Sequence, residues 1–321
     1  MLPPKNELRI CFAHAAYRLA ERFQLRKTGI AHVEVRSADE LAGELPASDV
    51  LVVSMLWKNE FAGGAARLKF IQSISSGTDW YDKDVLRARG IRLASAAGVN
   101  AEAVAQHAMA LILALRRRLP EARDNQRARH WRAMISEIAA REDQLTGKTL
   151  LVVGLGRIGA RLARLAKAFD MRVIATKRNP GIGAADVDAV AGNDRLQEML
   201  GQADIVAITC PLTPETENLI DAAALAAMRP TAHLINVARG RIVEEPALIQ
   251  ALQQKRIAAA GLDVTVEEPL PPSSPLWSMP NVLLTPHTAG ETQAYEDGVI
   301  DILLENLERL WRGEALVNQV V

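Results

Sequence analysis

The 321-residue sequence has very little cysteine. Its two cysteines, Cys11 and Cys210, lie far apart and match neither a metal-binding spacing nor a disulfide framework. We therefore expect no bound metal and no fold that depends on disulfides. A reducing cytoplasm is the simplest location for such a chain.

An excess of charge and a long hydrophobic run are also missing. Lysine plus arginine total 38, as do aspartate plus glutamate, so the net charge gives no reason to expect nucleic acid or a membrane as a partner. The most apolar helical stretch, residues 103–115, contains Gln106 and His107 and is shorter than the roughly 20 residues that span a bilayer. The first residues lack the apolar core of a signal peptide.

Short apolar segments alternate with helical patterns along most of the chain. This alternation predicts parallel sheets covered by helices, and the length indicates two domains. We expect an α/β fold of two Rossmann-like or flavodoxin-like domains separated by a cleft, one formed by residues 1–98 with 289–321 and the other by residues 99–288. The expected strands are residues 8–13, 49–54, 69–75, 91–96, 149–154, 172–176, 205–210, 233–237, 259–264 and 282–285, with long helices at 101–117 and 291–312.

A glycine pattern opens the second series of strands. The apolar residues 150–153 run directly into GLGRIG, and a helical pattern follows. In that setting the first glycine permits a tight turn, the second lets a pyrophosphate approach the backbone, and the third lets helix and strand pack closely. Free N–H groups at the helix start would bind the phosphates, although a glycine-rich turn without a ligand is the alternative. The candidate cofactor-binding residues of this turn are Gly154, Gly156, Arg157, Ile158 and Gly159.

The tip of the next strand bears on which dinucleotide binds. An NAD site usually carries an acidic residue there, which accepts a hydrogen bond from the ribose 2′-hydroxyl. Here the strand ends in Thr176, Lys177 and Arg178, and no carboxylate occurs between Asp170, which precedes the strand, and Asp186. A hydroxyl and two cations suit a 2′-phosphate. We expect NADP, as NADPH, to be preferred; the alternative is a solvated basic turn that also accepts NAD.

Three more polar residues follow strands of the second series. Arg239, Glu268 and His287 come after the strands expected at 233–237, 259–264 and 282–285, and ligands gather at the carboxyl ends of such strands. His287 can give a proton to the oxygen formed by hydride transfer to a ketone, and Glu268 can orient its ring and raise its pKa. Arg239 can bind a substrate carboxylate through two hydrogen bonds. Each residue alone is more often structural; together they favour a hydride-transfer site.

At this point the sequence resembles the D-isomer-specific 2-hydroxyacid dehydrogenase family over nearly the whole chain, and its basic strand tip resembles the glyoxylate and hydroxypyruvate reductase branches. The motifs that carry the resemblance are GLGRIG at 154–159, CPLTPET at 210–216, NVARG at 236–240, GLDV at 261–264, EPLP at 268–271 and TPHTAG at 285–290. The resemblance implies NAD(P)H-dependent reduction of a small 2-oxo acid to a D-2-hydroxy acid. It also implies the roles given above for Arg239, Glu268 and His287.

Other site positions come mainly from this resemblance. The positions that it implies near the cofactor are Cys210, Pro211, Thr216, Val237, Ala238, Asp263 and Gly290. In the first domain, the loop of Ser75, Ser76 and Gly77 resembles the family loop whose backbone N–H groups bind the substrate carboxylate. We therefore expect the first domain to bind substrate. The residues after another strand, Met55, Leu56 and Trp57, are candidates for the pocket wall or for the core.

The helix expected at 101–117 is apolar on more than one face, and such a helix is usually buried on several sides. In the family that the sequence resembles, the matching helix and the arm after it contribute to a two-fold dimer. We expect a homodimer, with an arm at about residues 119–145 and Trp131 as a candidate anchor. A core helix within one chain is the alternative.

Two other functions stay open. One is a dinucleotide-sensing binding protein, like the transcriptional co-repressors that resemble this family. The other is a dehydrogenase of the same architecture that acts on formate or phosphite. The favoured interpretation is an enzyme whose partner is a small 2-oxo or 2-hydroxy acid, and neither nucleic acid nor a membrane.

Overall fold

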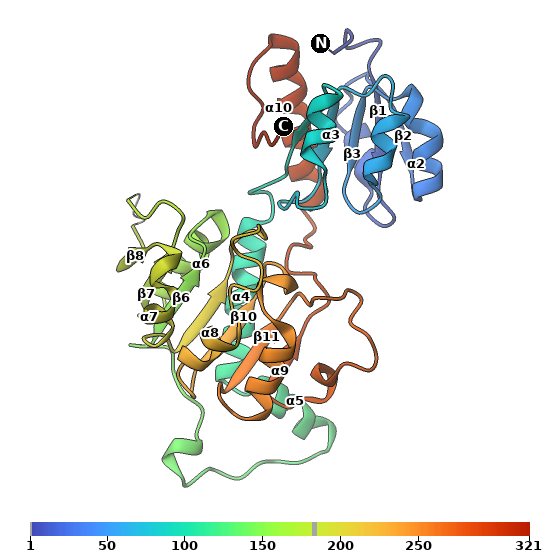
Figure 1. Cartoon of the computed structure of the whole chain (residues 1–321). Coiled ribbons are helices and arrows are strands. Elements are labelled where there is room, and N and C mark those ends of the chain that lie inside the picture. The colour runs from blue at the N-terminus through green and yellow to red at the C-terminus, as the bar shows by residue number, and fades with distance from the viewer. Residues whose placement is uncertain (1, 182–184) are drawn as a thin grey trace. The chain divides into compact units, whose positions relative to one another are not determined.

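The computed structural model describes residues 2–181 and 185–321, and the chain divides into two compact units (Figure 1). The first unit comprises Met1–Asn100 and Glu291–Val321, and the second comprises Ala101–Gly290. Each unit contains one parallel sheet, so the α/β class expected from the alternating sequence pattern is confirmed. Among the described helices, none combines the length and apolar character needed to cross a membrane.

The first unit is built on a five-stranded sheet with the order β2-β1-β3-β4-β5. Its strands are β1 (Arg9–Ala13), β2 (Ala31–Val35), β3 (Val50–Val53), β4 (Phe70–Ser73) and β5 (Arg92–Ala94). The central strands are wholly buried because helices and apolar side chains cover both faces. The helices of the N-terminal part are α1 (Leu19–Gln24), α2 (Ala38–Glu44) and α3 (Lys83–Ala88).

The last helix, α10 (Tyr295–Arg312), packs on this first sheet, although it follows the whole second unit in sequence. Val299, Leu303 and Leu307 recur at helical spacing and are fully buried there. The helix ends at Gly313, whose φ of 71° is the left-handed conformation that glycine adopts readily. After the second unit the chain thus returns to the first.

The second unit has a seven-stranded sheet with the order β12-β11-β10-β9-β6-β7-β8. Its strands are β6 (Thr149–Val153), β7 (Arg172–Thr176), β8 (Ala189–Ala191), β9 (Ile205–Ile208), β10 (His233–Asn236), β11 (Ala259–Leu262) and β12 (Val282–Leu284). The helices around this sheet are α4 (Ala101–Arg116), α5 (Leu119–Arg127), α6 (Arg157–Lys167), α7 (Leu196–Leu200), α8 (Ala222–Ala227) and α9 (Glu245–Gln253). All pairings in the sheet are parallel. The carboxyl ends of its strands therefore meet along one edge, which is where the candidate site lies.

The helix α4 lies against both the sheet and α6. Ala105, Ala108 and Ile112 are fully buried within the second unit, so much of the apolar surface of α4 is covered within one chain. The segment after it is different: Trp131, Met134 and Ile138 are 96%, 97% and 76% exposed. In Figure 1 this green segment, which starts from α5, stands away from the rest of the second unit.

Two short strands were not indicated by the sequence. The side chains of β2 lie at the edge of the first sheet and are mostly exposed, and β8 lies at the edge of the second sheet. An edge strand needs no continuous apolar run because only part of its surface meets the core. Neither strand changes the position of the candidate site.

Candidate active site

The glycine turn between β6 and α6 has the close packing that its sequence predicts. Gly154 has a φ of +99°, and a Cβ atom there would lie 2.5 Å from the Cβ of Cys210. A Cβ at Gly159 would lie 2.5 Å from the carbonyl oxygen of Gly154. Larger residues would therefore displace the backbone at both positions.

The amino end of α6 is open in the way that a phosphate group requires. A Cβ at Gly156 would meet no atom within 4 Å, and Gly156, which directly precedes the helix, has no side chain that could cap it. Arg157 is exposed and Ile158 is partly buried at the same end. Because the amino end of a helix attracts anions through its N–H groups and its dipole, these residues fit a dinucleotide pyrophosphate.

The tip of β7 is tied to the glycine turn through its backbone. The carbonyl oxygen of Thr176 accepts hydrogen bonds from the N–H groups of Gly154 and Leu155, at 3.2 and 2.9 Å. The hydroxyl of Thr176 is fully buried and has no hydrogen-bond partner among the described residues. Lys177 is partly exposed and Arg178 is exposed. Of the three groups expected to face a 2′-phosphate, the structure thus exposes only the two cations.

Arg178 lies near the CPLTPET segment. A hydrogen bond from Thr213 is the main cause that lowers the pKa of Glu215, and the positive charge of Arg178 lowers it further. In the same segment, the hydroxyl of Thr216 donates to the carbonyl oxygen of Pro211 at 2.7 Å. Burial raises the pKa of Cys210 to about 11. The thiol is therefore neutral near pH 7 and packs beneath the glycine turn.

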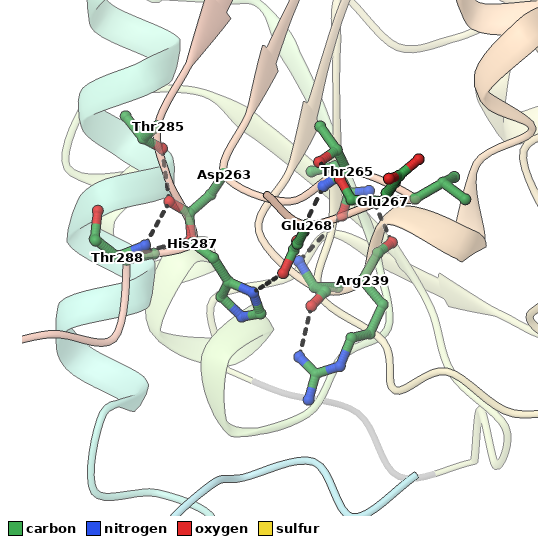
Figure 2. A network of polar contacts seen from close by, with 12 residues as sticks. Arg239, Asp263, Thr265, Glu267, Glu268, Thr285, His287 and Thr288 are labelled. Carbon is green, nitrogen blue, oxygen red and sulfur yellow. Dashed lines mark hydrogen bonds and ion pairs between the residues drawn. The ribbon is translucent and has the colours of Figure 1, made fainter. Parts of the chain in front are cut away.

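The position of Arg239 depends on the close approach of two loops. A Cβ at Gly240 would lie 2.0 Å from the backbone carbon of Thr265, so only glycine lets these loops touch. This contact places Arg239, which follows β10, beside the loop that carries Glu268 after β11 (Figure 2). The guanidinium of Arg239 donates to the carbonyl oxygen of Ala238 at 2.8 Å.

Glu268 and His287 form the central pair of the site (Figure 2). The Nδ1 atom of His287 lies 2.7 Å from Oε2 of Glu268, and the N–H of Thr265 donates to Oε1 at 3.1 Å. Burial alone would raise the pKa of Glu268. The hydrogen bond and charge of His287, the N–H of Thr265 and the charge of Arg239 outweigh that effect and lower the pKa below its ordinary value. Glu268 is thus an ionised partner for the imidazole.

The backbone of His287 is held by Asp263. His287 has a φ of +56°, which is uncommon for a residue other than glycine. Its N–H donates to the carbonyl oxygen of Asp263 at 2.8 Å. The Asp263 carboxylate is buried and accepts hydrogen bonds from the loop on both sides of His287. Asp263 was expected near the cofactor; its observed contacts are with the chain. The partly buried Gly290 ends this loop.

The other predicted lining positions differ in exposure. Cys210, Thr216, Val237 and Ala238 are buried, whereas Pro211 is exposed. They follow the ends of β9 and β10, so all belong to the same edge of the second sheet. Arg239, Glu268 and His287 belong to that edge too, and the structure brings these three together.

The predicted substrate loop lies in the first unit, after β4. Ser75, Ser76 and Gly77 are partly exposed, and the hydroxyl of Ser76 donates to Oδ1 of Asn100 at 2.9 Å. After β3, the side chain of Met55 is 84% exposed and Leu56 is partly buried. Trp57 is part of the apolar core, so of its two expected positions, the pocket wall and the core, the structure shows the core.

Several contacts in the site were not foreseen from the sequence. Gly240 allows the approach of two loops, and Thr209 donates to the carbonyl oxygen of Gly154 at 2.8 Å. His107 and Thr285 join the network around Asp263. Gly240 stands within the NVARG motif, which was a usable signal, but the partners of His107 depend on how a helix packs.

Comparison with known proteins adds to this geometry. A family model described as the NAD-binding domain of D-isomer-specific 2-hydroxyacid dehydrogenases matches residues 109–289. A glyoxylate reductase of Thermofilum pendens is 37% identical over 293 residues, which make up 89% of this chain and 86% of that protein. Glyoxylate/hydroxypyruvate reductase B of Yersinia enterocolitica is 38% identical over 261 residues, or 81% of this chain and 79% of that protein.

A solved structure agrees along almost the whole chain. The NADPH-dependent glyoxylate/hydroxypyruvate reductase of Sinorhizobium meliloti, in complex with NADP and malonate, superposes with a TM-score of 0.82 at 29% identity. The match covers 98% of this chain and 97% of that one.

Proposed function

Because the chain belongs to the D-isomer-specific 2-hydroxyacid dehydrogenase family, we propose that it reduces small 2-oxo acids of the glyoxylate or hydroxypyruvate type to D-2-hydroxy acids. The observation that carries this proposal is the 2.7 Å contact between Nδ1 of His287 and Oε2 of Glu268, with Arg239 beside the pair. The names of the relatives support the substrate class.

His287 acts as the acid in this proposal. Because Nδ1 of His287 contacts Glu268, Nε2 is the atom that donates a proton to the substrate oxygen as the hydroxy acid forms. An ionised Glu268 fixes the ring and stabilises its charged form. A dihydronicotinamide held at the amino end of α6 would supply the hydride for the carbonyl carbon. In the reverse direction His287 takes the proton back.

Arg239 binds the carboxylate of the substrate in this proposal. Its planar guanidinium can donate two parallel hydrogen bonds, which fix the position and the orientation of a 2-oxo acid. Backbone N–H groups of Ser75, Ser76 and Gly77 supply further donors, with Met55 and Leu56 near the substituent of the substrate. The first unit is then the substrate domain and the second the dinucleotide-binding domain.

NADPH is the preferred cofactor in this proposal, with NADH as a weaker alternative. The open amino end of α6 suits the pyrophosphate. Lys177 and Arg178 suit the 2′-phosphate because both lie at the tip of β7, where no described carboxylate follows the strand directly. Asp170 stands at the opposite end of β7.

We propose a homodimer as well. Trp131, Met134 and Ile138 expose large apolar side chains on one segment, and a second copy of the chain would cover them. A solution mass near the 34.9 kDa of one chain would contradict this part of the proposal.

Oxidation of NADPH, and separately of NADH, tests the reaction with glyoxylate, hydroxypyruvate, pyruvate and phenylpyruvate. We expect rapid oxidation of NADPH with at least one of the first two acids. Activity with NADH alone would keep the reaction and remove the NADP preference. If both dinucleotides bind and neither is oxidised, the proposed reaction is wrong, and a dinucleotide sensor or a formate- or phosphite-type substrate becomes the better explanation.

A further inference from the structure

The loop that carries His287 is wrapped around one buried side chain. The hydroxyl of Thr285 donates to Oδ1 of Asp263 at 2.6 Å, the N–H of Thr288 donates to the same oxygen at 3.0 Å, and the N–H of Ala289 donates to Oδ2 at 3.0 Å. The side chain of Asp263 is 1% exposed. The loop therefore holds its shape through donors that converge on this carboxylate from both sides of His287 (Figure 2).

A histidine from a different element completes this set of contacts. Nε2 of His107, on α4, lies 2.9 Å from the hydroxyl oxygen of Thr285 and 3.5 Å from Oδ1 of Asp263. The reason that α4 comes so near is Gly261 in β11, where a Cβ atom would lie 3.2 Å from the Cβ of Leu111. Leu111 is one helical turn after His107. The close packing of α4 on β11 thus brings His107 to the start of the loop.

The hydrogen bonds fix where the proton of His107 lies. The hydroxyl of Thr285 has one proton, which it donates to Oδ1 of Asp263 at 2.6 Å. The hydroxyl oxygen can then only accept from His107. Nε2 of His107 must carry a proton, and the donors run in one direction, from His107 to Thr285 to Asp263.

The loop needs such support because its backbone conformation at His287 is unfavourable. A φ of +56° outside glycine costs free energy and persists only where surrounding contacts enforce it. The contacts that enforce it on either side are those made by Asp263 and Thr285. His107 holds the hydroxyl of Thr285 in the orientation that this arrangement requires.

We propose that His107 is a positioning residue for His287, acting through Thr285 and Asp263. This inference rests on the proposed function, because it assigns a role within the same site. His107 itself transfers no proton to the substrate. A group that acts by orienting another affects the rate of the chemical step more than the binding of either substrate.

The test compares His107→Leu with His107→Gln, since glutamine keeps an N–H donor and leucine does not. We expect His107→Leu to lower kcat roughly 3- to 10-fold, the effect of one net hydrogen bond, with the KM for NADPH within about twofold of the parent. His107→Gln should recover most of the lost kcat. Thr285→Val and Thr285→Ser form a second pair with the same expected contrast. Gln106→Leu, an exposed neighbour on α4, is the matched control.

Two readouts do not depend on turnover. In the wild type, ¹⁵N shifts of the His107 ring should show a protonated Nε2, and the Thr288 and Ala289 amides should exchange faster in His107→Leu than in Gln106→Leu. Equal losses of kcat in the Leu and Gln variants, an unprotonated Nε2, or unchanged exchange would each overturn the inference. If the wild type reduces no 2-oxo acid, the proposed function fails, and the ring and amide measurements still decide whether His107 supports the loop.

Discussion

Two histidines stand at opposite ends of the second sheet, and their surroundings differ. His287 follows β12 at the carboxyl end; its side chain is 45% exposed and its Nδ1 contacts the Glu268 carboxylate. His233 opens β10 at the amino end, and the residue is 8% exposed. Burial, and then the charge of Arg116, lower the pKa of His233 to about 4, although Asp143 acts the other way.

Both residues carry the same imidazole side chain. They differ in solvent exposure and in the groups that surround the ring. An acid in catalysis must reach the substrate and must be able to hold a proton near working pH. His287 has an ionised partner and an exposed ring. His233 stays neutral in the folded protein because its charged form is poorly solvated. The four predictions below test this contrast, beginning with the largest expected effect.

His287→Ala should lower kcat for 2-oxo acid reduction by roughly 100- to 10,000-fold, the usual contribution of general acid catalysis. Steady-state kinetics with NADPH measures it. The matched control is His233→Leu, which should leave kcat within about twofold of the wild type at pH 7. A near-normal rate in His287→Ala, or a comparable loss in His233→Leu, would break the contrast between the two ends of the sheet.

His233 should instead affect stability against acid. Its pKa of about 4 in the folded protein lies below the ordinary value of 6.5, so the unfolded chain binds a proton first as the pH falls. The free energy of unfolding should therefore fall by about 3 kcal/mol between pH 6.5 and pH 4 because of this group. Urea unfolding at several pH values should show a smaller acid-induced loss for His233→Leu. An unchanged loss would mean that His233 is not kept neutral by burial.

Glu268→Gln tests the partner. A hydrogen bond that involves a charged group contributes about 1.5 to 3 kcal/mol, so we expect kcat to fall roughly 10- to 100-fold. In the wild type, the depressed pKa of Glu268 keeps the pair intact until the pH falls below the ordinary glutamate range. A near-normal kcat in Glu268→Gln would argue that Glu268 only fills space.

The sequence indicated that the candidate residues share one end of the sheet, but it did not indicate all of their contacts. Apolar runs in the sequence locate parallel strands, and the residues that follow such strands lie at one edge of the sheet whatever the details of packing. For this reason Arg239, Glu268 and His287 could be assigned to one site from the sequence. The partners of His107 depend on how α4 packs on β11, through Gly261 and Leu111. That contact joins residues far apart in sequence, and no local pattern records it.

The same contrast applies to the basic residues, and it gives the smallest predicted effect. Arg116, at the amino end, is 8% exposed and donates to Asp143 at 2.6 Å, whereas Arg178 and Lys177 at the carboxyl end have solvent-accessible surface. Replacing Lys177 and Arg178 with alanine should raise the KM for NADPH roughly tenfold and leave that for NADH nearly unchanged, because only NADPH offers a phosphate to charged donors. The preference should also weaken in high salt, which screens exposed charges. Arg172→Gln, at the amino end of β7, is the control. Equal changes for both dinucleotides would mean that the tip of β7 does not select the cofactor.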